Sequence, residues 1–333
     1  MARPPHQVAI VTVIPTSWPR RLAALWLVVL VVVAAAAGVL PLPFAASVPD
    51  LAHIAQPPFQ PGGHWLGTDP QGRDVLSLLV FGARTAVLLT VPGAVLAAAL
   101  GALAGGSAGF WGNAFRLPVP LWLLLLGSLW WGLQLPWPVV GLALGAVGAG
   151  GWLLARFSKR PSPAWSVPLD SAVMGMATAL DTIPRLVLVV SIAAGAGLSM
   201  SSLLVLLAFT AWAHPARLVR AQMLRVRALP FVEAAQAAGI PARRVWLFHA
   251  LPHAIQPLRT AFPLSIAVLL GLESTLSFLG IGLPPNVASW GYLLGTVRSE
   301  PSAWWAFLFP VICLSTSILS LTILARSKNK DDG

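Results

Sequence analysis

Long stretches without a charged residue are the feature that most restricts how this chain can fold. No Asp, Glu, Lys or Arg occurs between Arg84 and Arg116, or from Leu117 to Ala155. A helix of about 20 apolar residues crosses a bilayer because lipid cannot satisfy an open backbone. Only 9% of the residues are charged and 57% are hydrophobic, which excludes an ordinary soluble domain and a disordered chain. The sequence therefore predicts an all-α polytopic membrane protein.

The apolar runs predict about eight spans. Leu22 to Val39 is long for the core of a signal peptide, so we interpret it as an uncleaved anchor. Pro136-Trp137-Pro138 divides one uncharged run into two lengths of about one span each, and residues 195–201 break another. The predicted spans are 22–39, 85–106, two within 117–155, two within 171–219, 258–279 and 304–324.

The distribution of Lys and Arg predicts the orientation. If the N-terminus is cytoplasmic, only Arg73, Arg84 and Arg298 among the basic residues of loops and span ends fall outside, which satisfies the positive-inside rule. The net charge of +11 is then explained by cytoplasmic loops, and no nucleic-acid partner is expected. The predicted units are a cytoplasmic tail 1–21, two spans in 22–110 with an external loop 41–80, an extra pair of spans in 111–167, a core 168–326 containing a cytoplasmic loop 225–257, and a cytoplasmic tail 327–333.

The largest cytoplasmic loop carries a pattern typical of a helical hairpin. We predict helices at 229–238 and 242–249, hinged at Gly239-Ile240-Pro241, since glycine permits the bend and proline suits a first helical turn. Such a hairpin, with Glu233 at one end and Arg243 and Arg244 at the other, can act as a rigid plug for a soluble partner. The alternative is an amphipathic helix lying on the membrane surface.

This loop resembles the coupling loop of ABC-importer permeases. The family pattern is Glu-Ala-Ala, three residues, Gly, nine residues, then two residues and Leu-Pro. The matching positions are Glu233, Ala234, Ala235, Gly239, Leu251 and Pro252.

Two further segments resemble the dipeptide/oligopeptide/nickel branch of that family, in the order typical of its "C" subunit. The first is HWLGTD at 64–69 with GRDVLS at 72–77, and the second is LSFLGIGLP at 276–284 with SWG at 289–291. The resemblance covers roughly 15–110 and 168–326. It implies the type I permease fold of six core spans, so 111–167 is interpreted as an inserted two-helix hairpin, either facing lipid or docking a partner.

The resemblance also implies partners. These are a second homologous permease, two cytoplasmic ATPase subunits that use ATP and Mg²⁺, and an extracytoplasmic substrate-binding protein. The chain has no Gly-Lys-Ser/Thr phosphate loop, so we expect no bound cofactor and no enzymatic activity of its own. We predict a bacterial or archaeal cytoplasmic-membrane subunit for di- or oligopeptides, with nickel or another small solute as the alternative.

Two other classes are weighed against this prediction. A stand-alone secondary transporter would call for internal repeats with broken helices, and it would leave the loop motif unexplained. An intramembrane enzyme would need paired catalytic groups, whereas the carboxylates within spans, Asp181 and Glu273, have no recognisable catalytic setting.

Several charged side chains are candidates for function. We expect Glu233 to pair with a basic group on the ATPase. Asp181 and Arg185, four residues apart within a span, are candidates for the translocation pathway, and their expected role is mutual neutralisation. Glu273 either faces the translocation pathway, where it would meet a peptide amine or a cation, or bonds a neighbouring helix.

The external loop offers Asp69, Arg73 and Asp74. They either contact the binding protein or line the outer vestibule, or they form a self-satisfied ion-paired turn. No metal site is expected: the acidic spacing does not suit calcium, and Pro252 interrupts the face that His249 and His253 would share.

Overall fold

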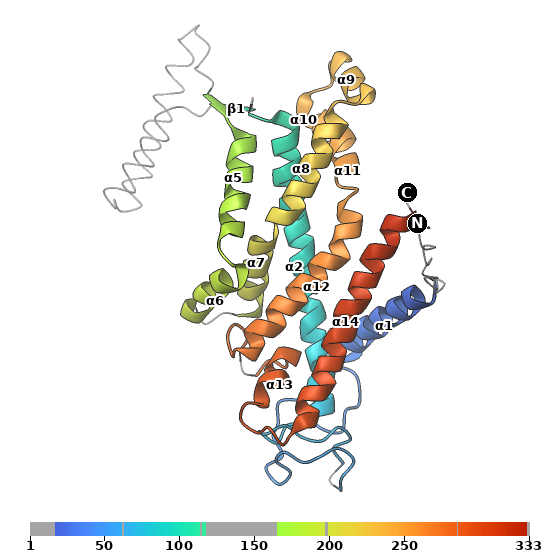
Figure 1. The fold of residues 1–333 in the computed structure, drawn as a ribbon, viewed down its shortest axis with the longest axis vertical. Helices are drawn as coiled ribbons and strands as arrows, with labels where there is room; N and C mark the ends of the chain where they lie inside the picture. Colours follow the sequence, from blue (N-terminus) through green and yellow to red (C-terminus); the bar gives the residue numbers. More distant parts are fainter. Residues whose placement is uncertain are drawn as a thin grey trace, which may run out of the picture.

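The structure is a computed structural model that describes residues 17–61, 63–113, 115–117, 165–196, 199–284 and 286–331. Within these ranges the chain is an elongated bundle of helices, apart from one pair of three-residue strands (Figure 1). The longer helices are α1 (Ser17–Ala36), α2 (Val75–Trp111), α5 (Leu169–Thr182), α6 (Arg185–Ala196), α7 (Met200–Ala211), α8 (Ala213–Arg227), α12 (Leu258–Phe278) and α14 (Trp304–Asp331).

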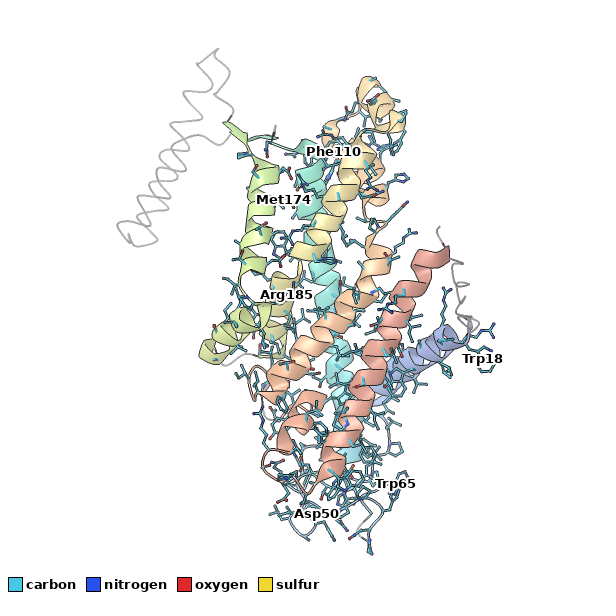
Figure 2. The ribbon with its side chains drawn as sticks, in the orientation of Figure 1. Trp18, Asp50, Trp65, Phe110, Met174 and Arg185 are labelled. Carbon is cyan, nitrogen blue, oxygen red and sulfur yellow. The ribbon has the colours of Figure 1, made fainter. Side chains whose placement is uncertain are left out.

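The long helix α2 is the axis of the bundle. It contacts α1, α5, α7, α8 and α12, and it runs from one end of the molecule to the other (Figure 1). One end, the loop end, carries residues 37–74, and the other, the hairpin end, carries the short helices that follow α8 (Figure 1). Figure 2 shows Asp50 and Trp65 at the loop end and Phe110 near the hairpin end.

Glycines let α8 approach α2 closely. A Cβ atom at Gly105 would lie 2.0 Å from the carbonyl oxygen of Ala216, and one at Gly109 would lie 2.8 Å from the Cβ of Met223. Small residues at this spacing are the usual means by which membrane helices bring their backbones together. The base of the hairpin is thus fixed to the central helix.

Six of the predicted spans lie on described residues. Among the described residues, four helices are long and apolar enough to cross a membrane, and up to six spans result if each bent helix pair counts as one. The bent pairs are α5 with α6, at 81°, and α7 with α8, at 41°. The sequence did not predict these bends, although Pro184 lies at the first.

One predicted boundary is wrong. Helix α2 begins at Val75, whereas the charge-free run placed the start at residue 85 and extended the loop to 80. The helix starts earlier because Asp74 caps it, accepting a hydrogen bond of 2.8 Å from the backbone N–H of Ser77. Arg84 can lie within the helix because its side chain is exposed, so its charge is not buried.

The predicted insertion falls largely on 118–164, outside the described residues, so the total of eight spans stays a prediction. Strands β1 (Phe115–Leu117) and β2 (Trp165–Val167) pair antiparallel on either side of that segment. The chain therefore leaves α2 and enters α5 at the same end of the molecule (Figure 1), as an insertion that preserves the later topology requires.

Candidate functional site

The hairpin at residues 229–254 is built of four short helical pieces at one end of the bundle. They are α9 (Pro230–Ala237), α10 (Ala242–Arg244), the π-helical turn η1 (Val245–Ala250) and α11 (Leu251–Ala254). Figure 1 shows α9 projecting beyond the ends of the spans. The predicted pair of helices is present, but the second continues past His249 because a π-helical turn carries the chain into Pro252, which occupies the first turn of α11.

Gly239 makes the bend between the two arms. Its φ is +77°, a left-handed conformation that favours glycine. Its N–H donates to the carbonyl of Gln236 at 3.0 Å, and the N–H of Ile240 donates to Ala235 at 3.2 Å. A Cβ at Gly239 would meet nothing within 4 Å, so backbone conformation, and not space, is what calls for glycine here.

Buried side chains hold the hairpin against the bundle. Val232, Val245, Ala250 and Ala254 are fully buried and belong to one cluster with Met223 of α8. Leu251 packs against this cluster from its edge, while Pro252 is exposed. The hairpin and α8 therefore share one packed core.

The outer face of the hairpin is charged and partly aromatic. Glu233, Ala234, Arg243 and Arg244 are exposed, and Ala235 is half-buried. Phe248 is 66% exposed. Among the ion pairs found in the described part of the chain, none involves Glu233, Arg243 or Arg244. These charges are available to a partner.

The loop end is an internally bonded turn. Asp69 is fully buried and accepts bonds from the side chain of Arg73, at 2.8 Å from Nε and 2.7 Å from Nη2, and from the backbone N–H groups of Gln71 and Arg73. Asp74 caps α2 and also contacts His64. This geometry favours the self-satisfied turn over a free binding surface for Asp69 and Asp74.

Indole hydrogen bonds join each of the two family-like segments at this end to a neighbouring helix. The indole N–H of Trp305 donates to the carbonyl of Thr68, and that of Trp290 donates to Leu79, both at 2.9 Å. A Cβ at Gly82 would lie 2.6 Å from the Trp290 ring. These residues join the start of α2 to α13 (Trp290–Thr296) and to α14, so their role in the described structure is packing.

Glu273 is enclosed by hydroxyl groups. It is 2% exposed and accepts bonds from Ser277 at 2.8 Å, from Ser289 at 2.7 Å and from its neighbour Ser274 at 3.2 Å. Because Ser289 lies at the start of α13, the side chain ties α12 to that helix. This arrangement favours the neighbouring-helix alternative.

Asp181 contacts Arg185, with 3.8 Å between its Oδ1 and the arginine Nη2, as the sequence predicted. It also forms a shorter ion pair with Arg217 of α8. Asp170 pairs with both Nε and Nη2 of Arg220 on the same helix. Sequence reasoning missed Arg217 and Arg220 because they are far from Asp181 and Asp170 along the chain. The two ion pairs connect α5 to α8, the helix that supports the hairpin.

A cavity of about 530 Å³ opens near the loop end, beside the first turns of α2. Arg73 and Arg84 supply its charges, whereas Glu273, Asp181 and Arg185 do not line it. Arg84 was not singled out from the sequence, although a lone arginine at the edge of a long apolar run was a usable signal. The other lining residues are Ala45, Ala46, Ser47, Leu78, Phe81, Thr85, Leu88, Met200, Asn286, Val287 and Ala288.

Comparison with known proteins agrees with this architecture. The sequence profile of the family described as "binding-protein-dependent transport system inner membrane component" matches residues 162–330. A Brucella suis biovar 1 (strain 1330) protein, named as a candidate permease of a peptide transport system, is 30% identical over 269 residues, which cover 80% of this chain and 72% of that protein. The Bacillus subtilis (strain 168) dipeptide transport system permease protein is 25% identical over 265 residues, covering 78% and 65% of the two chains.

Proposed function

Because the chain belongs to the family of binding-protein-dependent transport system inner membrane components, we propose that it forms half of a peptide pathway and is driven through its hairpin. Membership makes it a permease subunit of an ABC transport system, and its relatives are named for peptide transport. Di- and oligopeptides are therefore the proposed substrates, ahead of nickel and other small solutes. We further propose a second permease, two ATPase subunits and an extracytoplasmic binding protein as partners, with both termini in the cytoplasm.

The hairpin is the proposed site of energy coupling. The observation that carries this proposal is that Glu233 is exposed and outside every ion pair found among the described residues, on a helix held to α8 by a buried core. A basic group on the ATPase would pair with Glu233, and Ala234 and Ala235 would allow close packing. Closure of the ATPases on ATP would then move α8 and the helices bonded to it.

The cavity at the loop end is the proposed outer part of the pathway. Its walls come from α2 and from the segments around Met200 and Val287. Its lining is mostly small and apolar, with Arg84 positioned to meet a carboxylate group of a peptide. Asp69 and Asp74 would shape this vestibule without contacting the substrate.

Charge reversal at Glu233 tests the coupling role. We expect Glu233→Lys to leave the protein at its normal level in the membrane but to abolish peptide uptake and co-purification of the ATPase subunits. Losing one partner of an interfacial charge pair costs about 2–5 kcal/mol, which is more than tenfold in affinity. Glu300→Lys, a reversal outside the hairpin, should retain the ATPase subunits. Normal uptake by Glu233→Lys would contradict the proposal.

A further inference from the structure

The loop end holds a second group of ionisable side chains that neither coupling nor the proposed pathway uses. Asp50 Oδ2 is 2.8 Å from Nδ1 of His53 and 3.4 Å from Nε2 of His64. One ligand-type atom from each of the three residues lies within 4.8 Å of the others. Two imidazole nitrogens therefore converge on one carboxylate oxygen.

The partner on the other side of His64 determines what its ring can do. Its Nδ1 is 3.0 Å from Oδ1 of Asp74, whose other oxygen caps α2. Asp74 is placed to accept a hydrogen bond from Nδ1–H, and a neutral imidazole in that tautomer presents a lone pair at Nε2. That lone pair faces the carboxylate of Asp50, and two acceptors at 3.4 Å repel each other unless a cation lies between them.

The surroundings hold this arrangement in place. The His64 side chain is 1% exposed, and its ring stacks on Phe44 with 3.8 Å between centroids. Hydrogen bonding, first of all from His53, lowers the pKa of Asp50, so that carboxylate is ionised at neutral pH. The side chains of His53 and Asp50 are 36% and 31% exposed, which leaves one side of the group open to solvent.

Imidazole nitrogens combined with a carboxylate oxygen are typical ligands for divalent d-block ions. With metal–ligand bonds of about 2.0–2.2 Å, two ligands of a tetrahedral ion lie about 3.3–3.6 Å apart, a range that includes the 3.4 Å between Asp50 Oδ2 and His64 Nε2. A ligating histidine usually donates its other N–H to a carboxylate, and Asp74 occupies that position.

We propose that Asp50, His53 and His64 bind a divalent transition-metal ion of the zinc type, with Asp74 orienting His64. The ion would join the early part of the loop to the capped start of α2, and its open side would accept water or another ligand. The histidine pair considered from the sequence, His249 and His253, belongs to no such three-residue group among the described residues.

The test is Co²⁺ binding to the full chain, purified in detergent through a tag without histidine and stripped with a chelator. Visible absorption reports the coordination of Co²⁺ directly and does not depend on transport. We expect one saturable site per chain, with the bands lost on adding Zn²⁺. His53→Ala should weaken binding at least about tenfold, and Asp74→Asn, which can still cap the helix, should weaken it about 10–100-fold.

The double variant His249→Ala/His253→Ala is the matched control, because it removes two histidines elsewhere and should leave Co²⁺ affinity unchanged. Thermal unfolding of His53→Ala, whose side chain is partly exposed, checks that the variant is folded. Absence of a saturable site in the folded parent chain would overturn the proposal, as would equal affinity of the parent and His53→Ala. In those cases the group is better described as a hydrogen-bonded cluster that joins the loop to the start of α2.

Discussion

Two single residues, Glu273 and Gly239, show how local chemistry fixes the arrangement of helices. Glu273 is buried with three hydroxyl groups around it, and Gly239 is exposed with a left-handed backbone. Substitutions at the two residues are expected to have different effects, because the role of Glu273 depends on charge and hydrogen bonding and the role of Gly239 depends on backbone conformation.

Replacing Glu273 with Gln separates its two proposed roles. The amide keeps the size, and its oxygen can accept the two bonds that Oε1 receives from Ser277 and Ser289, but its NH2 group cannot accept the bond that Oε2 receives from Ser274. We therefore expect a loss of stability of about 1–3 kcal/mol and little change in substrate preference. Thermal unfolding and uptake of peptides of different charge measure these two effects. If uptake of one peptide class were lost selectively while stability stayed unchanged, Glu273 would have to be assigned to the translocation pathway instead.

Substitutions at Gly239 separate conformation from contact. Asn adopts left-handed backbone readily and should preserve most transport, whereas Pro, whose φ is held near −65°, should abolish uptake and uncouple the ATPase with normal membrane insertion. Uptake and ATPase assays in proteoliposomes measure both variants. If both variants showed equal, normal transport activity, the bend at Gly239 would have no role in coupling.

At the residue scale, the sequence predicted the positions that depend on local conformation. Gly239 was identified as the hinge from its place between two helical patterns. The partners of Glu273 were not, because Ser289 is separated from it by sixteen residues and by a change of direction that no local pattern encodes. Arg217 and Arg220 were missed as partners for the same reason.

At the scale of elements, the close contact between α2 and α8 holds in place the helix on which the hairpin packs. We expect Gly105→Val to destabilise the protein severely, since even a Cβ there would lie 2.0 Å from the Ala216 carbonyl oxygen and the backbones would have to separate. Gly175→Ala on α5 is the control, since its Cβ would meet nothing within 4 Å. Yield of monodisperse protein and thermal unfolding are the measurements. Comparable stability of both variants would contradict the close approach.

The helices themselves were predictable where apolar runs are long, as for α12 and α14, even though α12 contains Arg259 and Glu273. The start of α2 was misplaced because charge was used as a boundary, and an exposed arginine can lie inside a helix. The bend of 81° between α5 and α6 was not predicted, since proline indicates a break without giving its angle.

At the scale of the whole molecule, the two ends carry different chemistry. The hairpin end presents exposed charges and an exposed phenylalanine, while the loop end is a bonded turn beside a cavity. The sequence motifs identified the family, which the comparisons confirmed. They did not reveal the cavity, because its walls come from segments that only folding brings together.

Purification of the chain with its natural partners in mild detergent, followed by an ATPase assay, tests the central claim most directly. We predict recovery of a homologous permease and of ATP-hydrolysing subunits, both bound by the parent protein, with the ATPase subunits lost from Glu233→Lys. A lone, monodisperse chain that transports substrate in liposomes without ATP would contradict the account.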